Sequence, residues 1–301
     1  MLMKHVVSVS LGSSRRNKIV EVKIAGERFR IARIGTDGSL AKFAHWVREL
    51  DGQVDVLCFG GLDIYLYCGC RRYAFREALM LAKHARCTPV VDGSGWKNYV
   101  EPEAIAWIMR NGIIDLASAK VLLVSSVDRA GMARALHQSG CQLIFGDLAF
   151  ALGFNIGISK WWAYLLLGSV LVPVITKLPI AWVYPVGEKQ VQITPKYANL
   201  YAWADVIAGD FLLIRRYLPK RLDGKTVLTN TTTSEDAELL RARGLKRLIT
   251  TTPEFDGRTF GGNVMEGIVV ALMGKHPDEL SRNDYREALA LMDWQPNVVE
   301  W

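Results

Sequence analysis

Three predicted strand ends near the N-terminus carry hydroxyl, carboxylate and cationic side chains beside glycine. The segments are SLGSSRR at residues 10–16, GGLD at 60–63 and DGSGWKN at 92–98. Ligands of parallel sheets bind outside the carboxyl ends of the strands. Glycine lets a ligand approach the backbone, hydroxyls and carboxylates bind substrate hydroxyls, and Arg or Lys binds a carboxylate. The three segments therefore predict a site for a small polyhydroxylated or carboxylated molecule.

Lys97 is the residue of this set best suited to general acid–base catalysis, because a lysine beside an aspartate in a cleft can exchange a proton with a reacting hydroxyl. Asp92 or Asp63 would be its partner. We expect Arg15 to bind a substrate carboxylate, since a guanidinium can hold both oxygens. The alternative is that glycine and serine mark ordinary turns and that Asp92 caps a loop. The other predicted substrate-binding residues are Ser10, Ser13, Ser14 and Ser94.

A second candidate site lies in the segment Lys120–Asp147, whose pattern predicts a strand, a turn, a helix and a strand. An apolar run at 121–124 leads into Ser125 and Ser126, and a second apolar run ends at Asp147. In a dinucleotide-binding βαβ unit the turn holds the pyrophosphate, and an acidic residue about 20 positions later binds the adenosine ribose. Asp147 follows Ser126 by 21 positions. This spacing predicts a site for NAD or NADP, and the Asp147 carboxylate weakly favours NAD, because it would repel a 2′-phosphate.

The glycines of this turn depart from the dinucleotide-binding pattern. Aligned on G-x-G-x-x-G, the segment Ser126–Gly131 keeps only the third glycine, Gly131. Asp128 occupies the place where the backbone should approach a phosphate, although aspartate is also a good helix N-cap. Arg129 could offset that charge by pairing with the phosphate. A βαβ unit without a cofactor is the alternative.

The predicted cofactor-binding set extends to hydroxyls at the ends of later strands. Hydroxyl-rich strand ends can line a nucleotide groove, and they are also strong helix N-caps. The turn Gly261-Gly262-Asn263 opens a helix and is a further candidate for binding an anion. The full predicted set is Ser125, Ser126, Arg129, Gly131, Asp147, Thr229, Thr231 and Thr250.

The order of these elements predicts an α/β fold with two domains. An N-terminal α/β domain at 1–115 would bind the substrate, and a Rossmann-like, doubly wound parallel sheet at 116–301 would bind the dinucleotide. A hydrophobic helical insert is expected at about 148–180. The predicted elements include a hairpin at 20–34, a helix at 73–85, a helix with Pro102 in its first turn, a short strand at 181–184 and a helix capped by Ser234.

The hydrophobic insert is too short and too interrupted to span a bilayer comfortably. Its uncharged part, Trp161–Thr176, contains Pro173 and has Lys160 before it and Lys177 after it. A spanning helix needs about 20 apolar residues. We expect the segment to pack under the second sheet or against another subunit, most simply in a homodimer. Peripheral membrane contact stays open.

Composition places the chain among globular proteins. Of its 301 residues, 50% are hydrophobic and 22% are charged, and the formal net charge is +7. The basic residues are scattered, which favours an anionic small molecule over a nucleic acid. The chain has five cysteines, an odd number, and they lack the spacing of a zinc site. The five histidines show no metal-binding pattern. We therefore expect free thiols, no metal, and a cytoplasmic location, since the N-terminus lacks the features of a signal peptide.

Six segments together resemble a bacterial group labelled quinate 5-dehydrogenase-like, from Val6 to about Lys275. They are VVSVSLGSSRR, TPVVDGSG, ITPKY, WADVIAGDF, TNTTTSED and LITTTPEFDGR. The resemblance implies NAD(P)-linked oxidation of a cyclic hydroxy acid similar to quinate or shikimate, with a substrate domain before a Rossmann domain. The roles of Lys97 and Asp92 come from the strand ends and not from the resemblance. Since the turn at 126–131 is poor in glycine, an alternative stays open: a non-catalytic Rossmann-like protein that binds a metabolite or a partner.

Overall fold

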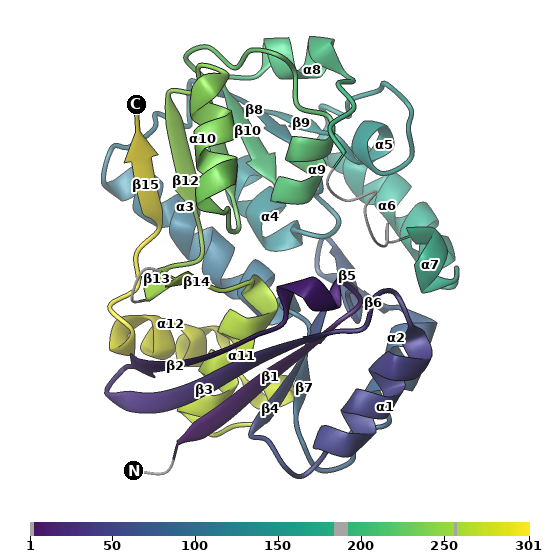
Figure 1. Cartoon of the computed structure of the whole chain (residues 1–301). Coiled ribbons are helices and arrows are strands. Elements are labelled where there is room, and N and C mark those ends of the chain that lie inside the picture. Colours follow the sequence, from purple (N-terminus) through teal and green to yellow (C-terminus); the bar gives the residue numbers. More distant parts are fainter. Residues whose placement is uncertain (1–2, 184–191, 256–257) are drawn as a thin grey trace.

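The computed structural model describes residues 3–183, 192–255 and 258–301 and contains two main sheets, one above the other in Figure 1. The lower sheet has the order β2-β3-β1-β4-β7. Its strands run parallel except β2, which is antiparallel to β3. Their bounds are β1 Lys4–Ser10, β2 Lys18–Ile24, β3 Glu27–Gly35, β4 Val56–Gly60 and β7 Val90–Val91.

The hairpin β2–β3 confirms the prediction at 20–34. Val20, Val22 and Ile24 are buried and alternate with exposed residues, which is the period of a strand covered on one face. The turn residues Ala25 and Gly26 have φ angles of 51° and 82°. Positive φ at both central positions gives the turn whose twist matches that of the two strands.

Helices from both ends of the chain cover the lower sheet. α1 (Leu40–Leu50) and α2 (Arg76–Ala82) pack on one face, and Phe43 meets Phe59 there with ring centroids 4.7 Å apart. α11 (Gly262–Met273) and α12 (Arg282–Leu291) cover the other face. Gly267 permits this approach, because a Cβ there would lie 2.4 Å from Cys58 Sγ. The C-terminal helices thus belong to the lower sheet's core, although the predicted boundary at residue 115 assigned them to the second domain; the division itself stays a prediction.

The upper sheet has the order β15-β12-β11-β10-β8-β9, with β15 antiparallel to β12 and all other neighbours parallel. β8 (Lys120–Leu123) is covered on both faces: Val121 and Leu123 point to one core, and Leu122 points to another. Strands buried on both faces give continuous apolar runs, which is why the run at 121–124 is so apolar. The other strands are β9 Gln142–Phe145, β10 Val206–Gly209, β11 Thr226–Thr229, β12 Arg247–Thr250 and β15 Asn297–Glu300.

Two sets of helices form these cores. α3 (Glu101–Arg110) and α4 (Ala130–Gln138) cover the face that meets the lower sheet's core. The opposite face is covered by α5 Asp147–Phe150, α8 Ala198–Trp203, α9 Phe211–Arg216 and α10 Ser234–Ala242. The prediction of a mixed α/β fold with parallel sheets in two regions is confirmed.

Several predicted elements differ from the structure. Residues 73–85 do not form one helix: β5 (Tyr65–Cys68) and β6 (Arg71–Ala74) make a separate hairpin before α2 begins. Residues 180–183 form the helical turn α7 (Ile180–Val183) instead of a strand, and Tyr184 lies outside the described residues. Thr233, not Ser234, caps α10, because its hydroxyl and the Asp236 carboxylate form a capping box. The remaining short elements are η1 Ser14–Arg16, the π-helical turn η2 Trp96–Val100, β13 Glu254–Phe255, β14 Arg258–Thr259 and η4 Pro277–Glu279.

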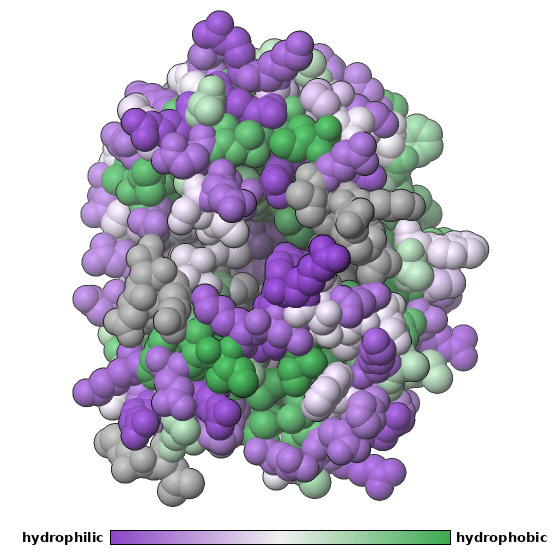
Figure 2. All heavy atoms as spheres, in the orientation of Figure 1, coloured by the Kyte–Doolittle hydropathy of each residue, from purple (hydrophilic) through white to green (hydrophobic). Residues whose placement is uncertain are grey.

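The hydrophobic insert forms α6 (Trp161–Ile175), which lies at the side of the molecule between the two sheet regions (Figure 1). Tyr164, Gly168 and Val172 are buried, whereas Trp162 is 67% exposed. The start of the segment packs on the edge of the upper sheet, where Tyr164 stacks on Phe145 of β9 with ring centroids 4.4 Å apart. The rest of α6 leaves apolar side chains exposed, and green apolar atoms mark this edge in Figure 2. Across the described residues, none of the helices is long and apolar enough to cross a membrane. Association with another subunit stays a prediction.

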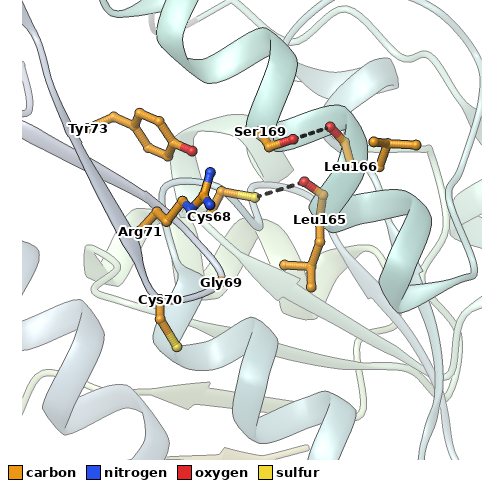
Figure 3. A pocket seen from close by; sticks show the side chains of 8 residues that line it. All are labelled: Cys68, Gly69, Cys70, Arg71, Tyr73, Leu165, Leu166 and Ser169. Carbon is orange, nitrogen blue, oxygen red and sulfur yellow. Dashed lines mark hydrogen bonds between the residues drawn. The ribbon is translucent and has the colours of Figure 1, made fainter.

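A small hollow of about 430 Å³ lies beside the contact between the β5–β6 hairpin and α6 (Figure 3). Cys68 Sγ lies 3.8 Å from the carbonyl oxygen of Leu165, and a Cβ on Gly168 would lie 2.2 Å from the same sulfur. Gly168 thus lets the hairpin touch the helix. Cys70 points away from the helix in Figure 3. We infer that this contact fixes α6 against the lower sheet region.

Candidate functional site

The carboxyl ends of strands from both sheets face one cleft of about 550 Å³. Figure 2 shows a hollow in the middle of the drawn face, at the height where the two sheet regions meet in Figure 1. A volume of this size suits a small organic ligand. The polar residues at the strand ends are Asp63, Asp92, Ser125, Asp128, Asp147, Asp210 and Asn230, and Lys97, Glu101 and Arg129 join them from the helices.

An apolar wall closes one side of the cleft. Leu171 and Val172 of α6 contribute to this wall, and Trp182 of α7 extends it toward solvent with 77% of its surface exposed. Tyr164 donates a hydrogen bond to the backbone oxygen of Ser126 at 3.2 Å, which ties α6 to the turn after β8. The hydrophobic insert therefore serves as a wall of the cleft.

Lys97 lies at the centre of the polar side, on the π-helical turn η2. Its Nζ is 2.6 Å from Asp63 Oδ1 and 2.5 Å from Asp128 Oδ1. Burial alone would lower the pKa of Lys97, but the two carboxylates raise it above its usual value. Burial raises the pKa of Asp63 to about 6 despite Lys97, whereas Lys97 and Arg129 outweigh burial and hold the pKa of Asp128 low. Lys97 is thus a charged anchor shared by two aspartates, and its catalytic role stays a prediction.

Arg129 forms a second anchor. Its guanidinium contacts Glu101 through Nη1, lies 3.2 Å from Asp210 Oδ2 and 3.6 Å from Asp128 Oδ2, and is only 2% exposed. Burial raises the pKa of Glu101 to about 7, against the attraction of Arg129. These contacts join the start of α3, the turn before α4 and the N-cap of α9. A phosphate would have to displace carboxylates that already hold Arg129.

The turn after β8 does not fit a pyrophosphate. Ser126 Oγ donates a hydrogen bond to Asp147, and the backbone N–H of Val127 donates to the same carboxylate at 3.0 Å. The two ends of the predicted cofactor motif therefore bind each other. Asp128, at the position expected to approach phosphate, faces Lys97 instead. Gly131 packs against the backbone of η2, since a Cβ there would lie 2.3 Å from the Lys97 carbonyl oxygen.

Asp92 organises a loop, as the alternative interpretation proposed. Its carboxylate accepts backbone hydrogen bonds from Ile64, Tyr65 and Ser94 at 2.6, 2.8 and 2.9 Å. Ser94 is buried, and its carbonyl accepts a bond from Asn98. Asp92 lines the cleft, whereas Ser94 is not among the lining residues.

The remaining predicted substrate-binding residues stand apart from the cleft lining. Ser10 Oγ accepts hydrogen bonds from Gly12 N–H and Arg33, and Ser13 Oγ accepts one from Arg15 N–H. Ser14 N–H bonds Asp37, and the Arg15 side chain lies in solvent. Ser10 pairs with Gly60 of the cleft lining, so this segment borders the cleft. The predicted direct contacts with a substrate stay predictions.

The predicted cofactor hydroxyls of the later strands also lie outside the lining. Thr229 Oγ1 donates to the carbonyl of Gly209 at 2.7 Å, and Thr250 is buried within the sheet. Thr231 is half-buried. Of the full predicted cofactor set, Ser125, Arg129 and Asp147 line the cleft, and Ser125 Oγ accepts a hydrogen bond from Asp210 N–H at 3.0 Å. Binding of NAD or NADP elsewhere in the cleft stays a prediction.

Sequence reasoning missed two buried acids, Glu101 and Glu266. Glu266 accepts hydrogen bonds from Gly93 N–H at 2.6 Å and Gly95 N–H at 3.1 Å, and burial raises its pKa to about 8. A single acid inside the apolar run 264–273 was the available signal, because an unpartnered carboxylate is too costly to bury. The glycines of the DGSG segment thus make room for α11 and not for a ligand: a Cβ on Gly95 would lie 2.4 Å from Glu266.

The predicted anion candidate at Gly261-Gly262-Asn263 does line the cleft, at the start of α11. Asn263 Nδ2 donates to Ser8 Oγ and to the Phe59 carbonyl, both at 3.0 Å. These bonds fix the helix start against β1 and β4. Within the described residues, no cluster of three or more His, Cys, Asp or Glu side chains could hold a metal ion.

Comparisons with solved structures find similar chains of low identity. An ABC transporter solute-binding protein from Burkholderia graminis C4D1M in complex with D-arabinose has a TM-score of 0.40 and 9% identity, over 99% of this chain and 95% of that chain. A sugar ABC transport substrate-binding protein from Bordetella parapertussis 12822 has a TM-score of 0.34 and 11% identity, over 89% and 78%. A Mycobacterium smegmatis protein in complex with β-D-fucofuranose has a TM-score of 0.36 and 10% identity, over 99% of each. No curated protein matches the chain.

The resemblance to quinate dehydrogenases is wrong, and the interpretation as an NAD(P)-dependent oxidoreductase of a cyclic hydroxy acid is wrong with it. The family models that match are described as domains of unknown function: DUF8753 over residues 5–92 and DUF8754 over residues 95–301. Since its model spans more than half of the sequence, the chain belongs to the family described as domain of unknown function DUF8754.

Proposed function

We propose that this protein binds a small polyhydroxylated molecule in the cleft between its two sheet regions, without converting it. The observation that carries the proposal is the cleft itself, in which strand ends of both sheets present carboxylates to one volume of about 550 Å³. Ligands of α/β sheets bind at this edge. The apolar wall of α6 and α7 would cover one face of the ligand.

The charges of the lining favour a ligand rich in hydrogen-bond donors. Six acids and three bases line the cleft: Asp63, Asp92, Glu101, Asp128, Asp147 and Asp210 against Lys97, Arg129 and Arg216. A carboxylate can accept about four hydrogen bonds. Those of Asp63, Asp128 and Asp210 are each held in place by Lys97 or Arg129, so a ligand hydroxyl would meet oriented acceptors.

The same contacts support binding over proton transfer by Lys97. A general base works best with a pKa near the operating pH. The two aspartates instead raise the pKa of Lys97 above its ordinary value and keep its ammonium charged. In this arrangement Lys97 holds its neighbours and can donate its third N–H to a ligand oxygen.

Thermal melting with a panel of neutral sugars and polyols, including D-arabinose and myo-inositol, tests this proposal. A ligand of the native state raises the melting temperature. Ala151→Trp would fill the cleft from an exposed lining position, and Ala41→Trp on the exposed side of α1 is the matched control. We expect at least one compound to stabilise the native protein and Ala41→Trp, but not Ala151→Trp. If no compound stabilises the native protein, or Ala151→Trp responds fully, the proposal fails.

A further inference from the structure

Two arginines converge on Gly12, in the segment that follows β1. A Cβ built on Gly12 would lie 2.7 Å from Arg33 Nη2 and 2.9 Å from Arg16 Nη2. Both guanidinium groups therefore reach the same small space. Arg33 is fixed there, because its Nη1 donates to the Ser13 carbonyl at 3.0 Å and its Nη2 donates to Ser10 Oγ at 3.1 Å. Arg16 lies in solvent at the end of η1.

These two cations lack an anionic partner among the residues that the structure describes. No carboxylate there forms an ion pair with either, and Asp37 is the acid whose charge raises the pKa of Arg33. Asp37 already accepts a 2.7 Å bond from Ser14 N–H and also faces Lys42 and Arg15. Burial and the charge of Arg16 both lower the pKa of Arg33. Two like charges held at one point repel each other, and an oxyanion between them would remove that cost.

This pair lies at the mouth of the cleft. A Cβ on Gly60, which lines the cleft, would lie 3.2 Å from Ser10 Oγ, the atom that Arg33 binds. A Cβ on Gly61, also in the lining, would lie 3.4 Å from Gly12 N. The short dark purple turn at residues 14–16 crosses the centre of Figure 1, and strongly hydrophilic atoms lie there beside the hollow in Figure 2.

We propose that Arg16 and Arg33 form an oxyanion subsite at the mouth of the cleft, and that the ligand is a polyol carrying one phosphate or carboxylate group. This inference rests on the proposed function. The acid-rich interior accepts the hydroxyl groups and repels an anion, whereas the arginine pair binds one. A guanidinium can hold two oxygens of such a group at once. In one molecule of this kind, the hydroxyl groups would bind the carboxylates of the interior and the oxyanion would bind the two arginines.

Titration calorimetry on the full chain with matched probes tests the subsite. D-ribose 5-phosphate and D-gluconate carry the two oxyanions, D-ribose and D-glucitol are the neutral counterparts, and inorganic phosphate is the anion alone. We expect at least one anionic probe to bind about tenfold or more tightly than its neutral counterpart, the factor that one charged hydrogen bond supplies. Arg16→Gln and Arg33→Gln should each remove that preference. Arg30→Gln, on an exposed position of β3, is the control. It removes one positive charge and should leave the preference for the anionic probe unchanged.

The outcomes separate the two proposals. The subsite is refuted and the cleft proposal stands if neutral polyols bind as tightly as their anionic counterparts. The same conclusion follows if Arg30→Gln lowers the affinity for the anionic probes as much as Arg16→Gln does. If phosphate binds and depends on Arg16 and Arg33 while no polyol binds, the subsite stands and the proposed function fails. Arg16 is exposed, so Arg16→Gln keeps the test decisive even if Arg33→Gln unfolds. A carboxylate source is distinguished from a phosphate source by which probe is preferred.

Discussion

Replacing Gly131 with alanine tests how closely α4 must approach the turn that carries Lys97. Gly131 is the second residue of α4, and the new Cβ would lie 2.3 Å from the Lys97 carbonyl oxygen and 2.8 Å from Asn98 Cα. Real Cβ atoms do not come this near to backbone, and backbone on both sides leaves little freedom to yield. The substitution must therefore push η2 and α4 apart.

Two effects of opposite sign decide the magnitude. In a helix interior alanine is more favourable than glycine by about 1 kcal/mol. Overpacking of a dense interior costs about 1–3 kcal/mol and occasionally more. Since the clash involves main-chain atoms and not a flexible side-chain end, we expect an overpacking cost near the upper end of this range, about 2–3 kcal/mol, which exceeds the gain from alanine. Gly131→Ala should lower the free energy of unfolding by about 1–2 kcal/mol.

Urea denaturation followed by circular dichroism measures this change directly. Gln138→Ala, at the exposed end of the same helix, is the control and should shift the free energy by no more than about 0.5 kcal/mol. A Gly131→Ala protein as stable as the native chain, or more stable, would show that α4 and η2 do not touch as described.

Two further predictions concern the buried charges. Replacing Arg129 with methionine leaves Glu101 buried without its cation and should lower the free energy of unfolding by about 3–5 kcal/mol. Arg110→Met, at an exposed position of α3, is the control and should change it little. Equal stability of the two variants in urea would contradict the anchor role of Arg129. Burial raises the pKa of Glu266 to about 8 from an ordinary 4.5, so the folded state binds this proton more tightly than the unfolded chain. Its contribution to stability is full below pH 4.5 and is lost as the pH rises toward 8. Glu266→Gln should flatten this decline in denaturation curves taken at several pH values, and an unchanged slope would exclude Glu266 as its source.

The sequence alone determined much of the fold. The alternation of strands and helices, the hairpin with Ala25 and Gly26 in its turn, and the helix ends at Gly112, Gly140 and Gly244 are set by local periodicity and backbone freedom. The residues that gather at the cleft, Asp63 and Lys97 among them, were also predicted, because parallel strand ends meet at one edge of a sheet. Local rules suffice wherever the partners are near in the chain.

Only the tertiary structure decided what these groups do. The sequence places Asp128 and Arg129 where a bound phosphate would lie. In the fold, Asp128 pairs with Lys97 and Arg129 pairs with Glu101, each about thirty positions earlier in the chain. Ser126 and Asp147 fit the spacing of a cofactor motif, yet they bind each other. Spacing specifies which residues share an edge, whereas the choice of partner depends on which charges burial brings together, and burial is a property of the whole chain.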